Sequence, residues 1–342
     1  MHFKFLRALA IGVDLGTANT LICFNDNIIV NEPSIVAIDA NTKILLASGS
    51  QAKIMHEKTN GSILTINPLK GGVIADFTGA ELMIKAFVDR TGLRSKNPFS
   101  SSLTMLFSVP TGITEVEKRA VKTSAINSGA SEVLMIYEPI ASAIGAGLDV
   151  GSSEGIMIVD IGGGTTQIAI ISLSGIVVEQ SIKTAGNTFN NDIRSYFKRE
   201  HNLLIGERSA EDIKIKVSEG SSKDGFDLMV WNVVGRDLIS GIPKSVKICH
   251  SDVIYALEKS IIRIEETIIK VLENAPPELA SDIHINGIHI SGGGALLMGL
   301  VDRLKAKIGL KFNTVEEPLT SVIKGTSIVL KDKKKYSSII FN

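Results

Sequence analysis

The sequence predicts an α/β protein made of two similar halves that face each other across a cleft. Apolar runs of strand length alternate with longer segments of helical period along the 342 residues. The order apolar strand, Asp-x-Gly-rich turn, apolar strand occurs at 9–24 and again at 155–172. A repeat of this length is too long for a solenoid, so it indicates a duplicated fold with a cleft between its halves.

The first half contains a hairpin around its turn, further strands and two helices. Apolar positions at helical spacing predict a helix over 80–90, and a second helix is expected over 115–128. We expect the strands 34–38 and 44–47 to continue the sheet that the hairpin begins. The other expected strands of this half are 9–13, 21–24, 103–109 and 132–137.

The second half repeats the strand-rich opening and ends in helices. Strands over 155–159 and 167–172 enclose the second turn. A long helix is expected over 251–274, and it stops at Pro276 and Pro277 because proline cannot continue a helix. The remaining expected elements are a strand at 287–290, a helix at 296–308 and a final helix that begins near Pro318.

Composition narrows the class of protein. Lys plus Arg equals Asp plus Glu at 36 each, so no net charge favours nucleic acid as a partner. Apolar residues make up 44% and charged residues 21%, which is ordinary for a soluble globular protein. Cys23 and Cys249 are too few for a disulfide framework, and we expect a reduced, cytoplasmic setting.

The N-terminus allows two interpretations. Its apolar stretch runs directly into Asp14 without a small-residue cleavage site, so we do not expect an export signal. No stretch reaches the roughly 18 apolar residues of a membrane span. The segment 3–7 combines Phe and Leu with Lys and Arg, which suits contact with a membrane surface. The alternative, which we favour, is that it leads into the first strand.

The first chemical candidate is the turn Asp14-Leu15-Gly16-Thr17-Ala18-Asn19-Thr20. Small residues let backbone N–H groups approach an anion, and the Thr hydroxyls add donors. In this interpretation the four residues after Leu15 bind phosphate, while Asp14 holds Mg²⁺ through water. The turn by itself is at least as typical of a plain hairpin connector.

The second turn, Asp160-Ile161-Gly162-Gly163-Gly164-Thr165-Thr166, makes the first more specific. Three consecutive glycines remove every Cβ from one side of the loop and permit close approach of the backbone to phosphates. Two turns that each open with Asp can clamp a polyphosphate from opposite sides of a cleft. Charge balance then calls for a divalent cation between Asp14 and Asp160. The sequence contains no Walker A motif, so a P-loop protein is excluded.

A third Gly-rich turn, Ser291-Gly292-Gly293-Gly294-Ala295, follows an expected strand and precedes an apolar helix. Its backbone could contact the sugar or the α-phosphate side of a nucleotide. As an isolated run of glycines it is equally typical of a tight strand-to-helix turn.

These three turns resemble the phosphate-one, phosphate-two and adenosine motifs of the superfamily of actin, DnaK-type chaperones and sugar kinases. Within it, the sequence is similar to the bacterial actins of the MreB family over roughly residues 9–330. The further matching strings are Asn31-Glu32-Pro33-Ser34, the segment 68–76, Val109-Pro110-Thr111-Gly112-Ile113-Thr114 and the segment 276–280.

The resemblance implies an actin-like fold, with two RNase H-like domains and a nucleotide cleft between them. Domain I would span residues 1–146, with the C-terminal segment 318–342 packing back on it. Domain II would span 147–317 and would include a smaller subdomain at about 183–250. The helix that begins at Glu138-Pro139 would cross a second connecting helix, where Gly325 opposes Ala143 and Gly145.

The resemblance also implies roles for site residues. Glu138 and Thr165 would orient the water that attacks the γ-phosphate, although a carboxylate at a helix start is at least as typical of capping. The S-x-x-D pattern at Ser209 predicts a capping box. In the family this helix flanks the adenosine, which implies Glu211 near the ribose and Lys214 near the base. Contacts with the nucleotide are thereby expected for Glu211, Asp212, Ile213 and Lys214.

Three departures from the family pattern each remove negative charge close to the inferred cleft. Gln167 stands where the family usually has Glu, and Tyr137 stands where an acidic residue commonly precedes the Glu-Pro pair. The segment Asn187-Thr188-Phe189-Asn190 replaces the usual acidic residues after Ala185-Gly186. Because both aspartates, Glu138 and Thr165 are retained, we expect ATP binding, with hydrolysis slow or altered.

The expected function is therefore a filament that depends on ATP or ADP with Mg²⁺. Cleft closure would set the subunit shape, and copies would stack head to tail in single or paired protofilaments. The family organises cell-shape machinery beneath the cytoplasmic membrane, or motility in wall-less cells, which implies a cytoplasmic protein at the inner face of that membrane. The alternative is a small-molecule kinase of the same superfamily, but the sequence shows no clear carboxylate base for it.

Overall fold

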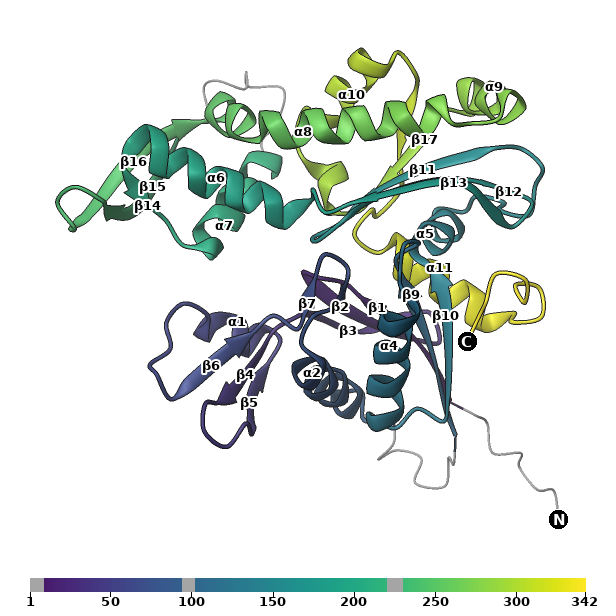
Figure 1. Ribbon diagram of the computed structural model, residues 1–342, viewed down its shortest axis with the longest axis horizontal. Coiled ribbons are helices and arrows are strands. Elements are labelled where there is room, and N and C mark those ends of the chain that lie inside the picture. The colour runs from purple at the N-terminus through teal and green to yellow at the C-terminus, as the bar shows by residue number, and fades with distance from the viewer. Residues whose placement is uncertain (1–8, 94–101, 220–229) are drawn as a thin grey trace.

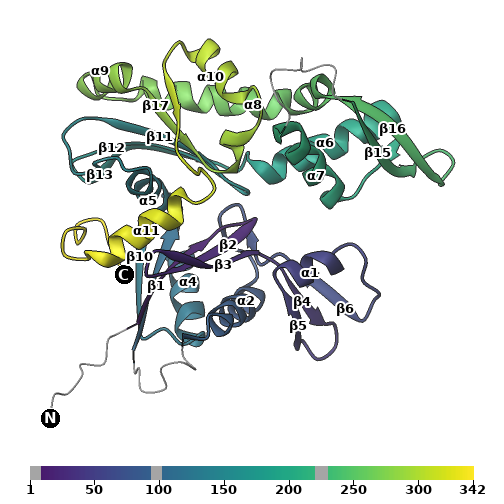
Figure 2. The same ribbon diagram turned by 180° about the vertical axis from the view of Figure 1, so that it is seen from behind.

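The computed structural model describes residues 9–93, 102–219 and 230–342, so the segment 3–7 lies outside the described residues. Figure 1 shows two lobes, each centred on a sheet, and each lobe carries a smaller arm toward the same side. Seen from behind in Figure 2, two helices, α5 (Glu138–Gly145) and α11 (Ser321–Lys331), lie between the lobes. This arrangement, with a sheet in each lobe and two helices between them, places the three Gly-rich turns between the lobes.

The first lobe is built on a five-stranded sheet in the order β10-β9-β1-β2-β3. Every residue of β9 (Leu103–Val109) is buried, because helices cover both faces of the sheet. Met105 packs in the cluster that contains Phe87 of α2 (Phe77–Arg90), whereas Leu106 packs with Ile140 of α5. The other elements are β1 (Leu9–Leu15), β2 (Asn19–Phe24), β3 (Asn27–Pro33), β10 (Glu132–Tyr137) and α4 (Glu115–Asn127).

The second lobe repeats that sheet, with the order β13-β12-β11-β17-β18. In each sheet the central strand forms an antiparallel hairpin on one side and a parallel pair on the other: β1 with β2 and β9, and β11 with β12 and β17. The predicted duplication is therefore present in the strand topology. The strands are β11 (Ile156–Ile161), β12 (Thr166–Ser172), β13 (Gly175–Ile182), β17 (Ile288–Ser291) and β18 (Phe312–Thr314). Helices α6 (Gly186–His201) and α8 (His250–Glu273) contribute to its core.

The first arm corrects the expectation that 34–38 and 44–47 continue the first sheet. Strands β4 (Val36–Asp39), β5 (Leu45–Ser48) and β6 (Ile63–Ile66) form a separate sheet in the order β5-β4-β6. The chain leaves the first sheet at Pro33, the last residue of β3, because proline cannot donate to a further ladder bond. Helix α1 (Ser50–Met55) packs beside this sheet.

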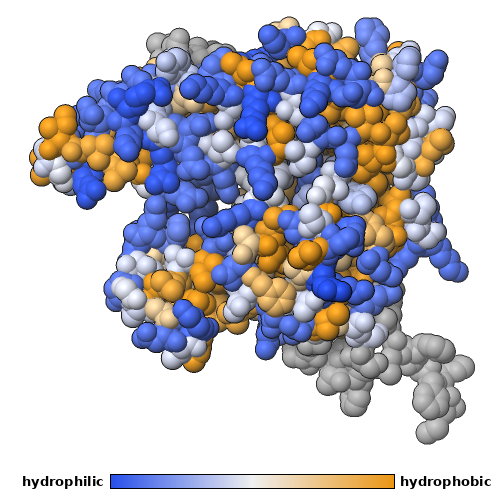
Figure 3. Space-filling view, viewed as in Figure 1, coloured by the Kyte–Doolittle hydropathy of each residue, from blue (hydrophilic) through white to orange (hydrophobic). Residues whose placement is uncertain are grey.

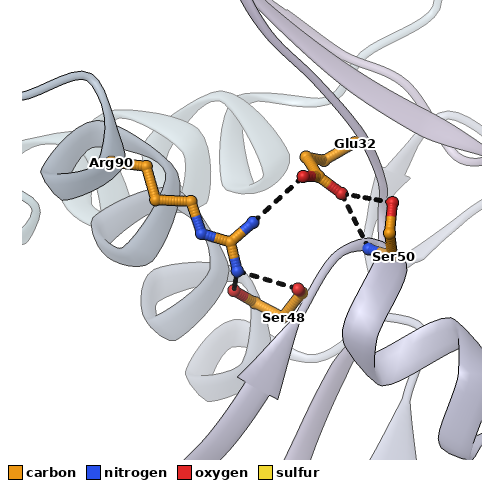
Figure 4. A network of polar contacts seen from close by, with 4 residues as sticks. All are labelled: Glu32, Ser48, Ser50 and Arg90. Carbon is orange, nitrogen blue, oxygen red and sulfur yellow. Dashed lines mark hydrogen bonds and ion pairs between the residues drawn. The ribbon is translucent and has the colours of Figure 1, made fainter.

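Glu32 and Arg90 attach the first arm to the first lobe (Figure 4). Arg90 donates to Glu32 Oε1 at 3.2 Å and, through Nη2, to the carbonyl and hydroxyl oxygens of Ser48 at 2.9 and 2.8 Å. The other oxygen of Glu32 accepts from the backbone N–H and the hydroxyl of Ser50, both at 2.7 Å. One carboxylate thus joins β3 and the end of α2 to the start of α1.

The second arm carries β14 (Leu203–Leu204), β15 (Val230–Asp237), β16 (Pro243–Cys249) and α7 (Glu207–Glu219). Its tip is apolar: Leu238, Ile239 and Ile242 between β15 and β16 are 42%, 81% and 63% exposed. Figure 3 shows apolar residues at the end of this arm and a notch in the outline between the two arms. The arms therefore border an opening that leads between the lobes.

The two helices between the lobes cross at glycines, as the sequence predicted. A Cβ at Gly145 would lie 1.8 Å from the carbonyl oxygen of Ser321, and one at Gly325 would lie 1.8 Å from that of Ala141. Buried hydroxyls add a polar contact between the two helices, since Ser142 Oγ lies 3.1 Å from Ser321 Oγ. The absence of side chains at these two positions lets the helix backbones touch.

Smaller elements complete the chain, and one of them differs from the prediction. The helix expected at 296–308 is split, because Gly299 at φ 79° separates a 3-10 turn (Gly293–Leu296) from α10 (Leu300–Ile308). The others are β7 (Leu69–Lys70), β8 (Val73–Ile74) and α9 (Pro277–Asn286). Among the described residues, no helix combines the length and apolarity that crossing a membrane requires.

Replacing Gly325 by Ala is expected to destabilise the protein strongly, because the added methyl group must displace the backbone of α5. Overpacking of this kind costs about 3 kcal/mol, and we expect the midpoint of thermal unfolding to fall by several degrees. Gly112→Ala is the control, since a Cβ there would meet no atom within 4 Å. Equal midpoints for the two variants would refute the close crossing.

Candidate functional site

A cavity of about 610 Å³ lies between the lobes, and all three Gly-rich turns border it. From the predicted sites it is lined by Asp14, Gly16, Thr17, Ala18, Asn19, Glu138, Asp160, Gly162, Gly163, Gly164, Thr165, Glu211, Lys214, Gly292, Gly293 and Gly294. The structure does not bring Asp212, Ile213 or Ala295 to this cavity. Asp212 is exposed on the surface of α7, while Ile213 and Ala295 are buried in the core of the second lobe.

The first turn joins β1 to β2 and is held from the first lobe. A Cβ at Gly16 would lie 2.5 Å from the carbonyl oxygen of Asn19, so the tight turn requires glycine. Ser34 donates its hydroxyl to Gly16 O at 2.6 Å. Thr17 Oγ1 accepts the backbone N–H of Gly72 at 2.9 Å. The turn is therefore fixed before any ligand binds.

The second turn joins β11 to β12 and touches the first turn directly. A Cβ at Gly163 would lie 2.5 Å from the Cβ of Ala18, and one at Gly164 would lie 2.3 Å from Thr17 Oγ1. Glycine at 163 and 164 is thus needed for the two turns to meet. This contact accounts for two glycines of the Gly-Gly-Gly run, and it leaves only backbone and small side chains facing the cavity at this point.

The third turn approaches the second from the same lobe. Gly292 has φ 78°, a conformation that favours glycine, and a Cβ there would lie 2.4 Å from Asp160 Oδ1. A Cβ at Gly294 would lie 2.2 Å from Ile161 Cγ2. Each of the three turns therefore uses glycine where two backbones converge on the cavity.

Three carboxyl groups face one another across the floor of the cavity. Burial raises the pKa of Asp14 to about 6, although Ser108 donates a hydrogen bond to it at 2.9 Å. Burial and the charge of Asp14 raise the pKa of Asp160 to about 7. Burial, followed by the charges of both aspartates, raises the pKa of Glu138 well above its usual range. The three groups therefore resist full ionisation unless a cation joins them.

Glu138 is the first residue of α5, where a carboxylate suits the N-terminal end of a helix. Its Oε2 accepts from Nε2 of Gln167, on β12 of the opposite lobe. The residue also lines the cavity, so the structure is compatible with a helix-start role and with a role in the cavity. Thr165 is 8% exposed and lines the same cavity, and a Cβ at Gly72 would meet it at 3.2 Å.

Helix α7 begins at Glu207, so the capping box predicted at Ser209 is wrong. The first turn of α7 contacts the first arm, since the backbone N–H of Glu207 donates to Glu57 Oε2 at 3.1 Å. Glu211 pairs with Lys53 of the first arm at 2.7 Å across the opening. Lys214 donates to Gly186 O at 3.0 Å, and burial lowers its pKa to about 8.

Sequence reasoning missed an apolar side of the cavity. Phe189 and Asn187, noted only as departures, line it, and the Asn187 N–H also donates to Gly163 O at 2.7 Å. No motif marks the others, because single apolar residues look the same whether they line a cavity or a core. These are Leu21, Ile215, Leu296, Leu297, Pro318, Leu319 and Val322.

The cavity fits a divalent cation bound together with a phosphate. Of the described residues that line it, only Lys214 is basic, so the three carboxyl groups lack a matching positive charge. Among the described residues, no group of three or more His, Cys, Asp or Glu side chains could hold a metal without other ligands. Mg²⁺ typically combines one or two carboxylates with phosphate oxygens and water, and Asp14 and Asp160 provide such a pair.

Two duplicated sheets, crossed helices between them and a cavity bordered by three Gly-rich turns define an actin-like protein. A match to the MreB/Mbl protein family covers residues 8–338. This chain belongs to the MreB/Mbl family, as the sequence resemblance predicted.

Relatives and solved structures agree with this family. The chain is 44% identical to the cell shape-determining protein Mbl of Bacillus subtilis, over 95% of this chain and 96% of the relative. It is 42% identical to the cell shape-determining protein MreB of Escherichia coli, over 94% and 93%. The crystal structure of Spiroplasma citri MreB5 bound to ADP superimposes with a TM-score of 0.89 at 38% identity, over 97% and 99%.

A more distant structure supports the fold alone. The double helical filament of MamK gives a TM-score of 0.78 at 21% identity, over 95% of this chain and 99% of that chain. The actin-like fold that the sequence predicted is thereby confirmed at the level of the backbone.

The raised pKa of Asp160 predicts that the metal-free, nucleotide-free protein loses stability as pH rises. The folded state retains a proton that the unfolded chain releases near pH 4, so stability falls between about pH 4 and about pH 7. Asp160→Asn cannot ionise, and its midpoint of thermal unfolding should fall less between pH 5 and pH 8. The exposed Asp302→Asn is the control and should follow the wild type. Parallel profiles for Asp160→Asn and wild type would contradict the assignment.

Proposed function

We propose that this protein binds ATP between its lobes and polymerises into cytoskeletal filaments that serve cell shape. The observation that carries the proposal is the direct contact of two Gly-rich turns beside paired aspartates, in a chain of the MreB/Mbl family. Support also comes from relatives named cell shape-determining proteins and from a similar structure that was crystallised with AMPPNP.

In the proposed complex, the backbone N–H groups of residues 16–19 and 163–165 surround the phosphates. Gly162 lines the cavity at the same turn, but its own N–H donates to Thr165 O at 2.9 Å. The apolar side of the cavity, which includes Ile215 and Leu297, accepts the base, with Glu211 near the ribose and Lys214 near the base. Contacts of the nucleotide with Asp212, Ile213 and Ala295 would require these residues to move, because none of them lines the cavity. Bound Mg²⁺, held by Asp14 and Asp160, would neutralise phosphate charge and lower the pKa of Glu138.

ATP hydrolysis is the proposed chemistry of the same cavity. Glu138 and Thr165 line the cavity beside the second turn, where a carboxylate oxygen and a hydroxyl can orient a water molecule toward the γ-phosphate. Glu138 can act as a base toward water only while ionised, so the reaction depends on a cation that offsets the charges of Asp14 and Asp160. Slow or altered hydrolysis stays the expectation that the three departures from the family pattern set.

Filament formation follows from two lobes that respond to the nucleotide. We propose that residues 1–146 with 318–342 move as one body against 147–317, with a smaller subdomain at about 183–250. A head-to-tail contact is heterologous, and its repetition produces an open polymer, as single or paired protofilaments. The exposed apolar tip at Ile239 and Ile242 is a surface that such contacts could cover. The MamK filament supports this assembly through its shared fold.

The proposed location is the cytoplasm, at the inner face of the membrane. The names of the relatives support a partner in cell-shape machinery, and motility in a wall-less cell is the variant of this role that the family resemblance allows. Contact with the membrane through the segment 3–7 stays a prediction, since that segment lies outside the described residues.

We expect the purified protein to sediment as a polymer when ATP and Mg²⁺ are present. Asp160→Ala is the matched variant, and it should lose the ATP-dependent part of the pellet because one cation ligand is missing. The measurement is high-speed sedimentation with ATP, ADP or no nucleotide. A protein that stays in the supernatant in every nucleotide state would refute the filament. ATP turnover only after addition of a sugar or another small hydroxyl compound would favour the kinase alternative instead.

Glu138→Ala is expected to retain ATP binding and to lose phosphate release. Loss of a positioned carboxylate lowers the rate of such reactions by about 100-fold, whereas the binding turns are untouched. Binding is measured with a fluorescent ATP analogue and release with a phosphate assay. Glu278→Ala, an exposed change on α9, should match the wild type in both. Equal release by Glu138→Ala and wild type would remove Glu138 from the chemistry.

A further inference from the structure

Gln167 is buried next to the cavity, and its side chain connects the second lobe to the first through hydrogen bonds. The residue is 1% exposed on β12, directly opposite Asp160 on β11, so both side chains project from the same face of the second sheet. It does not line the cavity itself. Its contacts instead reach the first lobe at two places, Thr111 after β9 and Glu138 at the start of α5.

The orientation of the Gln167 amide is determined by its partners. The backbone N–H of Thr111 can only donate, and it donates to Oε1 of Gln167 at 3.1 Å. The amide nitrogen must then face the other way, where it donates to Oε2 of Glu138. In this chain the side chain at position 167 accepts from one partner and donates to the other, which glutamine does at any pH.

This hydrogen bond fixes the position of the Glu138 carboxyl group. The bond occupies Oε2 and leaves Oε1 as the acceptor for a water molecule in the cavity. Gln167 therefore restricts the rotation of the carboxylate, and its side-chain hydrogen bonds go to Thr111 and Glu138 and not to the nucleotide-binding turns.

We propose that Gln167 is a positioning residue for ATP hydrolysis, which acts by holding Glu138 in one orientation across the two lobes. The inference rests on the proposed hydrolysis and adds to it a second-lobe residue that reports closure of the cleft. Its two bonds to the first lobe form together only when the lobes are as close as they are here, so the orientation of Glu138 is linked to their approach.

Steady-state phosphate release by the full-length protein tests this role. Gln167→Ala should lower kcat by about 10-fold, because a carboxylate that rotates freely spends less time in the productive orientation, with KM and ATP affinity within a factor of two. Gln167→Leu keeps most of the side-chain volume but can neither accept from Thr111 nor donate to Glu138, so a similar loss of kcat is expected. Gln180→Ala on β13 is the control and should leave kcat unchanged.

A double-variant comparison separates positioning from a structural effect. If Gln167 acts through Glu138, adding Gln167→Ala to Glu138→Gln should change kcat by less than a factor of two, because the orientation no longer matters. Equal fold losses in both backgrounds, or a wild-type kcat in Gln167→Ala, would overturn the inference and leave the proposed hydrolysis standing. Wild-type release no faster than that of Glu138→Gln would instead refute the hydrolysis, and the inference with it. Thermal midpoints identify any variant that fails to fold, and if Gln167→Ala fails to fold, the comparison is made with Gln167→Leu.

Discussion

The contact between the two Gly-rich turns is the constraint on which the rest of this structure depends. Gly163 meets Ala18 and Gly164 meets Thr17 at distances that leave no room for a Cβ. The turns can meet only if the two sheets present their central hairpins to each other, and the crossing of α5 and α11 at Gly145 and Gly325 allows that approach. Small residues at the turns and at the helix crossing therefore have the same effect, which is to let the two lobes approach closely.

That geometry concentrates negative charge at the floor of the cavity. Asp14, Asp160 and Glu138 each belong to a separate element, and the approach of the lobes brings them together without a matching basic side chain among the described lining residues. The consequence is a site that is electrostatically incomplete when empty, since the pKa values of all three groups are raised. A cation bound together with a polyphosphate would reduce the repulsion among these three carboxyl groups. Binding at the site would therefore stabilise the arrangement in which the lobes are close together.

The arms add a second set of contacts far from the turns. Lys53 pairs with Glu211 at 2.7 Å, and Glu57 accepts the N–H of Glu207 at 3.1 Å, so the first arm meets α7 over the opening of the cleft. The Glu32 and Arg90 contacts fix that arm to the first lobe. Surface ion pairs contribute little stability individually. Because the contacts between the first arm and α7 join the two lobes, they form when the lobes come together, as the contact between the turns does.

The sequence by itself determined the duplicated α/β fold, the family and the three turns, because strands, glycine runs and aspartates at turn positions are local patterns. It did not determine that 36–48 forms a separate sheet, that α7 begins at Glu207, or that the helix at 296–308 breaks at Gly299. The separate sheet depends on the pairing of β4 with β6, and the start of α7 is met by Glu57, which is far away in the chain. The helix break depends on the backbone conformation that Gly299 adopts. The role of Gln167 likewise emerged only in three dimensions, since its two partners, Thr111 and Glu138, lie 56 and 29 positions away in the chain and on the other lobe. Local pattern thus specified the parts, and long-range packing decided which side chains meet.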